Sequence, residues 1–374
     1  MTDAVTWTQT ATADGARSGV LVTPHGSVPT PNFMAVGTRA TVRTLDSEDL
    51  ERLGADIVLA NTYHLMLRPG ADVVEHLGGV HRFMGWDKPI LTDSGGYQVL
   101  SLEPQITEDG LVFRSSYDGS RVELSPERAV HVQEMLGSDI AMVLDVPVRL
   151  PSSREDAESA MYRTLRWSER AHAAKRCTDR ALFGIVQGGA DPELRAISAR
   201  ETAELGFPGH GIGGLAVGES AIDRARAIEA VVPELPERAV RYVMGLGDTE
   251  GIIDAVGRGV DLFDCVIPTR LARHGKALTR LGDVSVKQKA WNADSRPIED
   301  DCPCPACTRH SRAYLRHLHR TRELTGLRLL TLHNLTYMYR LMADIRSTIA
   351  DGSFTTWSEE LVTRRSHGVG QPPG

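Results

Sequence analysis

The sequence has no long apolar run. No stretch approaches the roughly 20 apolar residues that a membrane-spanning helix needs, and residues 1–26 lack the apolar core of about 7–15 residues that a signal peptide requires. These absences argue against a membrane span and against secretion, so we expect a cytoplasmic protein. At 374 residues, 41% of them hydrophobic, the chain is nevertheless long enough to bury a sizeable core.

Cysteine is scarce, with five in the chain, and three of them are crowded together at Cys302, Cys304 and Cys307. An odd number in this spacing favours a metal site over a set of disulfides. Zinc would need a fourth ligand, and the sequence offers the histidines His310, His317, His319 and His333. Three thiolates and one imidazole leave no position for a catalytic water, so we expect one structural zinc ion per chain.

The chain also lacks an excess of positive charge, since its net charge is −7. This net charge argues weakly against a protein that binds nucleic acid over most of its surface. The segment 268–346, however, has 15 Lys or Arg against 7 Asp or Glu, a net charge of +8 that leaves −15 for the remainder. A basic C-terminal third on an acidic body indicates either a local footprint for a polyanion or an ordinary solvated helical surface.

Short apolar runs rich in β-branched residues recur eight times, most of them separated by a helix-like stretch. The runs are 33–36, 57–60, 90–92, 140–144, 182–186, 211–213, 242–244 and 262–263, and amphipathic stretches include 152–174, 192–205 and 221–231. Polar residues or glycines follow nearly every run: Asn61, Asp93, Asp145, Gln187, Gly214, Gly245 and Asp264. The count of eight and this placement predict an α/β fold, a (β/α)8 TIM barrel whose active site lies at one face. A doubly wound open sheet is the alternative.

The predicted domain organisation is one TIM-barrel domain, 1–374, with a zinc subdomain, 268–320, inserted after the last barrel strand. A closing helix over 329–349 would carry His333, and 352–374 would form a tail. The connection 97–133 is long for a barrel and alternates like a hairpin around 112–114 and 122–124.

Two aspartates at strand ends suggest chemistry. Asp93 precedes a pair of glycines that leave the backbone open to a planar ligand, and Asp264 lies in a buried-strand pattern where an unpaired carboxylate is costly. As in retaining glycoside hydrolysis, one carboxylate could attack an anomeric carbon while the other moves protons. Considered singly, each aspartate could equally be a helix cap or an ion-pair partner.

Four segments together carry a resemblance to a known family. They are Asp93-Ser94-Gly95-Gly96-Tyr97-Gln98, Gly213-Gly214-Leu215-Ala216-Val217-Gly218-Glu219, the run from Asp261 to Arg270, and Cys302-x-Cys304-x-x-Cys307. In this order they resemble bacterial-type queuine tRNA-ribosyltransferase, also called tRNA-guanine transglycosylase. The resemblance runs from about Phe33 to Met342.

The resemblance implies a pentosyltransferase that acts in queuosine biosynthesis. It would exchange the wobble guanine of tRNAs with G-U-N anticodons, those for aspartate, asparagine, histidine and tyrosine, for a 7-deazaguanine, preQ1 by family habit. Asp264 would be the nucleophile that attacks ribose C1′, and Asp93 the general acid and base. The family's zinc ligands fall on Cys302, Cys304, Cys307 and His333. The family also forms homodimers.

Further residues are implied to hold the substrates. The base would contact Asp93, Ser94, Gly95, Gly96, Tyr97, Asp145, Gln187, Gly214, Leu215 and Met244. The anticodon loop would contact Gly245, Leu246, Gly247, Asp248, Thr249, Glu250 and Gly251 and also Thr269, Arg270, Leu271, Ala272 and Arg273. Since an anticodon loop is single-stranded, its base can be splayed out and stacked on an aromatic ring.

One position departs from the family pattern. Where the family usually has Asp-Glu-Cys, this chain has Asp145-Val146-Pro147, so queuine and preQ0 stay open beside preQ1. Two other classes compete with the transferase. A zinc-dependent nucleobase hydrolase would need histidine ligands at strand ends, and a non-catalytic tRNA-binding subunit would have lost the nucleophile.

Overall fold

The computed structural model describes residues 4–215 and 218–367, and its centre is a closed barrel of eight parallel strands. In barrel order the strands are β4 (Asn32–Gly37), β5 (Val58–Ala60), β6 (Ile90–Thr92), β10 (Ile140–Met142), β11 (Ala181–Val186), β12 (Gly209–Ile212), β13 (Val240–Val243) and β14 (Leu262–Cys265). The barrel closes where β14 pairs with β4, for example Asp264 opposite Met34. The TIM-barrel prediction is confirmed, because a doubly wound sheet would have free edges.

Each barrel strand is buried on both faces, and this explains the continuous apolar runs in the sequence. In β4, Met34 and Val36 belong to a cluster that fills the barrel, whereas Phe33 and Ala35 belong to the cluster beneath the outer helices. The alternation follows from the two-residue period of a strand.

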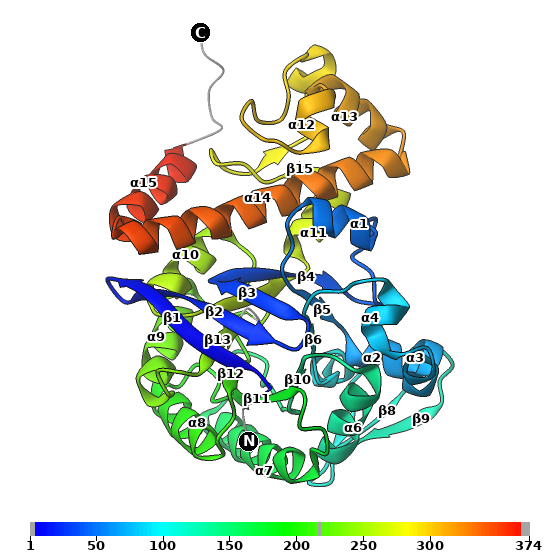
Figure 1. Ribbon diagram of the computed structural model, residues 1–374, viewed down its shortest axis with the longest axis vertical. Coiled ribbons are helices and arrows are strands. Elements are labelled where there is room, and N and C mark those ends of the chain that lie inside the picture. Colours follow the sequence, from blue (N-terminus) through cyan, green and yellow to red (C-terminus); the bar gives the residue numbers. More distant parts are fainter. Residues whose placement is uncertain (1–3, 216–217, 368–374) are drawn as a thin grey trace.

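An antiparallel sheet that the sequence did not lead us to expect covers the N-terminal end of the barrel. It contains β1 (Thr6–Ala13), β2 (Ala16–Thr23) and β3 (Gly26–Thr30), and Figure 1 shows it in front of the barrel strands. Trp7, Leu21 and Val28 from this sheet pack into the interior cluster. Arg17 is buried beside Asp261 and donates to it over 2.5 and 2.9 Å, which fixes the sheet to the start of β14.

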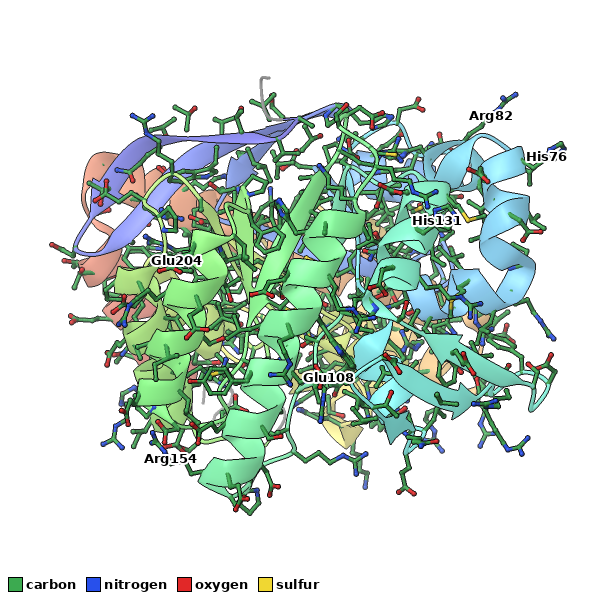
Figure 2. The ribbon with its side chains drawn as sticks, turned by 90° about the horizontal axis from the view of Figure 1, so that it is seen from below. His76, Arg82, Glu108, His131, Arg154 and Glu204 are labelled. Carbon is green, nitrogen blue, oxygen red and sulfur yellow. The ribbon has the colours of Figure 1, made fainter. Side chains whose placement is uncertain are left out.

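Helices surround the strands. They are α1 (Ser47–Arg52), α2 (Thr62–Leu65), the π-turn η1 (Met66–Gly70), α3 (Ala71–His76), α4 (Gly79–Met84), α5 (Gly96–Leu100), α6 (Pro126–Leu136), α7 (Arg154–Ala174), α8 (Pro192–Glu204), α9 (Ala221–Val231), the 3-10 turn η2 (Val232–Glu234), α10 (Thr249–Gly257) and α11 (Ile267–Arg273). Ser153 and Asp191 cap α7 and α8 by accepting from backbone amides of the first turn. In Figure 2, Arg154 at the start of α7 and Glu204 at the end of α8 lie toward opposite ends of the barrel.

The long connection after β6 forms a three-stranded sheet of β7 (Gln105–Ile106), β8 (Leu111–Arg114) and β9 (Arg121–Leu124). The β8–β9 hairpin was expected from the sequence. Glu108, labelled in Figure 2, lies between β7 and β8 and forms ion pairs with Arg163 and Arg166 of α7. These pairs hold the small sheet against the outer wall of the barrel.

The segment 268–320, expected to be a zinc subdomain, contains β15 (Lys276–Ala277), β16 (Val284–Ser285), the 3-10 turn η3 (Lys289–Ala293), α12 (Pro305–Arg309) and α13 (Arg312–Arg320). The closing helix is longer than expected: α14 spans Leu324–Asp351 and crosses one side of the molecule in Figure 1. The segment 352–374, expected only as a tail, contains the helix α15 (Phe354–His367). Residues 368–374 lie outside the described part of the chain.

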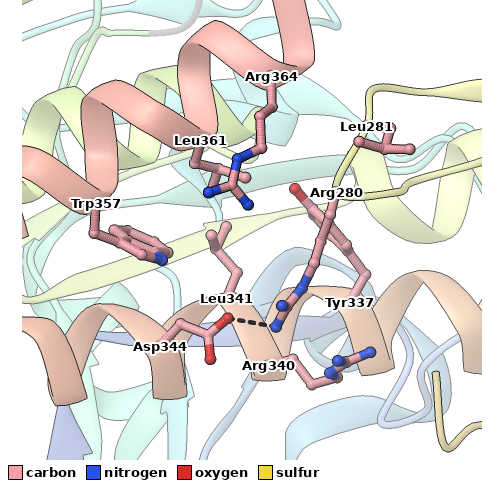
Figure 3. A pocket seen from close by; sticks show the side chains of 9 residues that line it. All are labelled: Arg280, Leu281, Tyr337, Arg340, Leu341, Asp344, Trp357, Leu361 and Arg364. Atoms are coloured by element: carbon pink, nitrogen blue, oxygen red, sulfur yellow. Dashed lines mark hydrogen bonds and ion pairs between the residues drawn. The ribbon is translucent and has the colours of Figure 1, made fainter. Parts of the chain in front are cut away.

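Helix α15 packs on α14 and leaves a small cavity of about 210 Å³ between them and the β15–β16 turn. Figure 3 shows Trp357, Leu361 and Arg364 of α15 above α14, with Arg280 donating to Asp344 over 2.6 Å. Within the described residues, no helix is long and apolar enough to cross a membrane.

Candidate functional site

A cavity of about 460 Å³ opens at the C-terminal ends of the barrel strands. Side chains that follow β5, β6, β10, β13 and β14 converge on it, among them Asn61, Asp93, Asp145, Met244 and Val266. This is the face on which (β/α)8 barrels place their active sites. The seven strand-end residues identified in the sequence therefore meet at this mouth. Six of them line the cavity, and the seventh, Gln187, bonds to Asp145.

Asp93 follows β6 directly, and amide groups surround its carboxylate. The backbone amide of Thr62 donates to Oδ1 over 2.8 Å, and Gln98 donates to Oδ2 over 2.9 Å. Asn61 donates to the same Oδ2. Burial raises the pKa of Asp93 to about 6, against the effect of these hydrogen bonds and with a contribution from the charge of Asp264. A carboxyl group with this pKa can both give and take a proton near neutral pH.

Asp264 is the third residue of β14, and two donors hold one of its oxygens. The hydroxyl of Tyr242 donates to Oδ1 over 2.5 Å, and the amide of Gly245 donates to the same atom over 2.8 Å. Burial raises the pKa of Asp264, although both donors oppose the rise. Within the described residues Oδ2 has no hydrogen-bond partner, so this oxygen is free to react with a molecule in the cavity.

Asp145 and Gln187 form a pair on the opposite wall. Gln187 donates to Asp145 Oδ2 over 2.6 Å, and Gln187 Oε1 is buried without a partner among the described residues. Burial raises the pKa of Asp145 to about 6, and the charge of Asp93 adds to the rise. Gly214 has a φ of +67°, and a Cβ there would come within 2.6 Å of Gln187 Oε1, so only glycine fits. Asp145 lines the cavity and can accept from a planar polar ligand, and Gln187 holds its carboxylate.

The other residues expected to bind the base lie around these carboxylates. Tyr97, Met244, Leu215 and Ser94 line the cavity, and Tyr97 is 62% exposed. Gly95 has a φ of +83°, and Gly96 is packed beneath the site, where a Cβ would come within 2.9 Å of Leu144. Ala216 and Val217 of the glycine-rich motif lie outside the described residues.

The two segments expected to contact RNA are less open than the sequence suggests. In 245–251, Leu246, Gly247, Thr249 and Gly251 are buried. Asp248 caps α10, and Glu250 pairs with Arg365. In 269–273, Thr269 and Ala272 are buried, whereas Arg270 is exposed and lines the cavity. Gly245 and Arg270 are thus the members that reach the mouth.

Arginines without acidic partners gather beside the mouth. Arg43 and Arg270 lie close enough to Arg273 that their charges lower its pKa, after the larger effect of burial. Arg39 and Arg68 lie over the ring of Tyr117, at 5.6 and 4.7 Å, and Tyr117 bonds to the cavity residue His64 over 2.9 Å. None of these five arginines forms an ion pair with any residue that the structure describes. The rim of the cavity is therefore electropositive.

Sequence reasoning assigned no role to several residues that shape the site. Tyr242 and Asn61 contact the two aspartates directly. Arg195 is fully buried and donates to the carbonyl of Gly213 over 2.7 Å, which supports the glycine-rich turn. Asn61, which follows β5, was recognised as a strand-end residue, but its spacing in the sequence did not reveal that it bonds to Asp93. Tyr242 and Arg195 gave no signal, because strand register and helix packing decide which atoms they meet.

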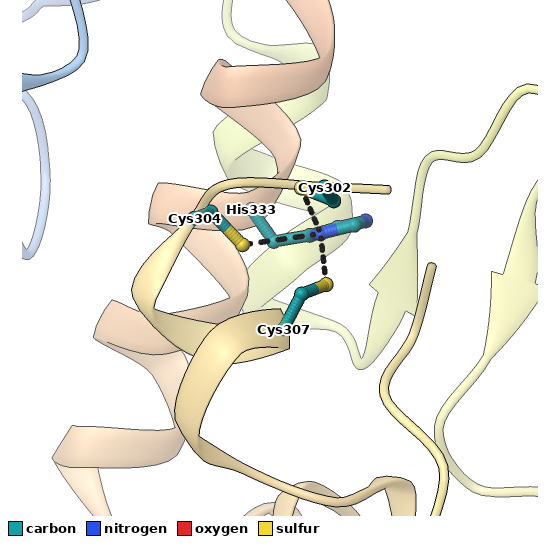
Figure 4. Close-up of side chains that lie close together, drawn as sticks. All are labelled: Cys302, Cys304, Cys307 and His333. Carbon is teal, nitrogen blue, oxygen red and sulfur yellow. Dashed lines mark hydrogen bonds between the residues drawn. The ribbon is translucent and has the colours of Figure 1, made fainter. Parts of the chain in front are cut away.

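Cys302, Cys304, Cys307 and His333 form a buried group whose ligand atoms lie within 4.8 Å of one another. Figure 4 shows the three thiols around Nδ1 of His333, at 3.6, 3.5 and 3.4 Å. A tetrahedral zinc ion would place sulfur and nitrogen roughly 3.5 Å apart, so the group fits a metal ion of this kind. The other ring nitrogen, Nε2, bonds to the carbonyl of Leu278 over 2.9 Å, which orients the imidazole. Of the four candidate histidines, the structure selects His333.

A closed (β/α)8 barrel with paired aspartates at its mouth defines an enzyme of the TIM-barrel class. The family model described as queuine tRNA-ribosyltransferase matches residues 12–367. Curated relatives with this name include those of Natranaerobius thermophilus, 49% identical over 94% of this chain and 96% of the relative, and of Moorella thermoacetica, 49% identical over 95% of each. The relative from Thioalkalivibrio sulfidiphilus is 48% identical over 96% of this chain and 98% of its own length. The chain belongs to the queuine tRNA-ribosyltransferase family, whose members are pentosyltransferases.

Proposed function

We propose that the protein exchanges the wobble guanine of G-U-N anticodon tRNAs for a 7-deazaguanine at the mouth of the barrel. The observation that carries the proposal is the joint placement of Asp93 and Asp264 in one cavity of a chain from this family. Acceptors on Asp145 and Gln187 would read the hydrogen-bonding edge of the base, and Tyr97 and Met244 would cover its two faces.

The reaction proceeds in two displacements. Oδ2 of Asp264 attacks C1′ of the nucleotide, the C1′–N9 bond breaks with its electron pair passing to N9, and protonated Asp93 supplies a proton to the departing guanine. The incoming base then loses its N9 proton to Asp93, and N9 attacks C1′. The ester bond to Asp264 breaks in this second step and returns the carboxylate. Tyr242 and Gly245 hold Oδ1 throughout, which keeps Oδ2 aimed at the sugar.

The electropositive rim supports RNA as the partner. The exposed arginines Arg39, Arg43, Arg68 and Arg270 and the partly buried Arg273 would contact phosphates on both sides of the splayed nucleotide. Arginines without carboxylate partners are suited to this. In the loop 245–251 the contact would be confined to the backbone near Gly245, because most of its other residues are buried.

The two competing classes find less support. The groups of three or more metal-ligating residues in the described part of the chain are the Cys3His cluster and the trio His25, His81 and Asp139, and neither lines the mouth. A hydrolase that uses metal-bound water would need such a group there. A non-catalytic subunit would not need a carboxylate that two hydrogen bonds fix in position, as they do for Asp264.

The proposal is tested by incubating the protein with unmodified tRNA and radiolabelled guanine. We expect the wild type to incorporate label and Asp264→Asn to incorporate none while still retaining tRNA on a filter. Wild-type protein that contains its metal and binds tRNA, yet incorporates no label, would contradict the proposal.

We propose preQ1 as the incoming base, with Pro147 lining the cavity near Asp145 where the family usually has cysteine. Competition among preQ1, preQ0 and queuine for the labelled tRNA should show preQ1 displacing guanine at the lowest concentration. Preferential use of queuine would overturn this choice.

We also propose that the ion in the Cys3His group is zinc and that the enzyme is a homodimer. Elemental analysis should find zinc tightly held by this group, and its removal by a chelator should unfold α12 and loosen α14, since four buried ligands join them. Sedimentation at micromolar concentration should give twice the chain mass of 40.8 kDa. A zinc-free active enzyme or a monomer would contradict these two statements.

A further inference from the structure

We propose that His25, His81 and Asp139 form a second cation site, for a divalent ion of the zinc, nickel or cobalt type, at the N-terminal end of the barrel. The site is separate from the reaction. Asp139 accepts from the amide of Ile90 at the start of β6, whereas Asp93 follows the end of that strand. The inference therefore does not depend on the proposed function.

Three distant segments of the chain meet at this cluster. His25 lies in the turn between β2 and β3 of the N-terminal sheet, His81 lies in α4, and Asp139 immediately precedes β10. Contacts among residues so far apart are formed only in the folded protein, so a ligand bound here would join the sheet, a helix and the barrel wall.

The donor atoms are already close together. His25 Nδ1 lies 2.8 Å from Asp139 Oδ1, and His81 Nε2 lies 3.0 Å from Oδ2. The two imidazole rings are stacked with centroids 3.7 Å apart and planes inclined by 18°, so both nitrogens face the same carboxylate. All three ligand atoms lie within 4.8 Å of one another. In an ion's coordination shell, nitrogen and oxygen ligands at about 2.1 Å are roughly 3.0–3.4 Å apart, and both nitrogen–oxygen contacts are already close to this spacing.

The buried carboxylate of Asp139 would be stabilised by a bound cation. The carboxylate of Asp139 has no exposed surface, and its ion-pair partners in the described residues are two histidines, without any lysine or arginine. A buried carboxylate needs compensating positive charge, and imidazoles supply it only when protonated.

The chemistry of the donors selects the class of ion. Two imidazole nitrogens and one carboxylate oxygen suit zinc, nickel and cobalt better than calcium or magnesium, which prefer oxygen. Backbone amides of His25 and Ile90 donate to the two carboxylate oxygens over 3.1 and 2.8 Å and so fix the orientation of Asp139. The ring of His25 is 41% exposed, and water can complete the coordination on that side.

The experiment measures bound metal in the intact protein. Protein that retains the ion of its Cys3His group is dialysed to equilibrium against zinc chloride, and metal per chain is found by elemental analysis. We expect two ions per chain for the wild type and one for His25→Ala. Asp139→Asn should also bind one if it folds. His25 lies in an exposed turn, so His25→Ala keeps the test valid even if the aspartate variant does not fold.

The matched control is His76→Ala, which removes an exposed histidine, labelled in Figure 2, at the end of α3, the helix that precedes α4. This variant should bind two ions. Nickel chloride should raise the melting temperature of the wild type and of His76→Ala but not of His25→Ala. One ion per chain in the wild type, or two in His25→Ala, would overturn the proposal.

Discussion

At the scale of single residues, the cavity at the barrel mouth gathers three carboxyl groups with raised pKa values. The values are about 6 for Asp93 and for Asp145, and the pKa of Asp264 is also raised. Burial is the largest cause in each case, the charge of Asp264 adds to it for Asp93, and the charge of Asp93 adds to it for Asp145. Groups tuned in this way can transfer protons near neutral pH, but their ionisation costs stability.

The pKa of Asp93 predicts how the release of guanine depends on pH. In the proposed mechanism, protonated Asp93 supplies the proton to the departing base, and the population of this protonated form falls about tenfold per pH unit above pH 6. In single turnovers with pre-labelled tRNA, we expect guanine release to slow accordingly between about pH 6.5 and pH 8.5. Asp93→Asn should be slower by a factor of about 100 or more and should lack this dependence. A wild-type rate that is flat over the range would exclude Asp93 as the acid.

The raised pKa of Asp145 predicts that removing the charge of this side chain stabilises the folded protein. Because its pKa is raised in the folded state, the folded protein binds this proton more tightly than the unfolded chain. Ionisation therefore destabilises the fold as pH rises from about 4 through 6. Asp145→Asn should raise the free energy of unfolding by about 2 kcal/mol at pH 7.5 and by almost nothing at pH 4. Urea denaturation at both values measures this, with the exposed Glu75→Gln as control, and an equal gain at both pH values would refute the explanation.

The hydrogen bond from Tyr242 to Asp264 predicts that Tyr242→Phe slows the reaction without weakening tRNA binding. Among the described residues, its hydroxyl bonds to Asp264 Oδ1, so Tyr242→Phe removes one charge-assisted hydrogen bond, worth about 1.5–3 kcal/mol. We expect kcat to fall by a factor of about 10–100 while KM for tRNA stays within about twofold. A rise in KM with unchanged kcat would show that the tyrosine contributes to binding instead.

At the scale of elements, the sequence predicted the barrel strands, because their apolar runs and the polar residues at their ends can be recognised from the sequence alone. All eight barrel strands were located, because runs such as 182–186 are buried on both faces and so are continuously apolar. The sheet β1–β3 was missed: in β1 most side chains are exposed, and the strand is interrupted by a bulge between Gln9 and Ala11. Helix α15 was missed because its sequence is mostly polar.

Helix α15 depends on one buried arginine. Arg365 is 6% exposed and donates to Glu250 over 2.6 Å, to Asp283 over 3.0 Å and to the carbonyl of Thr279. These contacts join α15 to α10 and to the β15–β16 turn. The helix therefore obtains its stability from tertiary contacts that the local sequence does not reveal.

Arg365→Ala should lower the free energy of unfolding by about 2–4 kcal/mol, because it leaves Glu250 and the carbonyl of Thr279 without this donor and leaves Asp283 paired with Lys276 alone. The adjacent Arg364 provides the control, since it pairs with the exposed Glu360 on its own helix. Arg364→Ala should cost less than about 0.5 kcal/mol. Chemical denaturation compares the two variants, and equal effects would contradict the assignment.

At the scale of the whole molecule, the two ends of the barrel have different tasks. The C-terminal end carries the cavity, the held aspartates and the arginine rim, and the N-terminal end carries the β1–β3 sheet and the His25–His81–Asp139 cluster. The Cys3His group joins the segment after β14 to α14, outside the mouth. Substitutions at the N-terminal end should therefore change stability without changing the exchange reaction.

The most direct test of the central claim is to look for the covalent intermediate. Protein and unmodified tRNA are mixed without any incoming base, quenched in acid, digested with nuclease and protease, and examined by mass spectrometry. We predict a peptide that contains Asp264 and carries a ribose-linked nucleotide without its base, absent from Asp264→Asn. Active exchange with no adduct on this peptide, or with the adduct on another residue, would contradict the account.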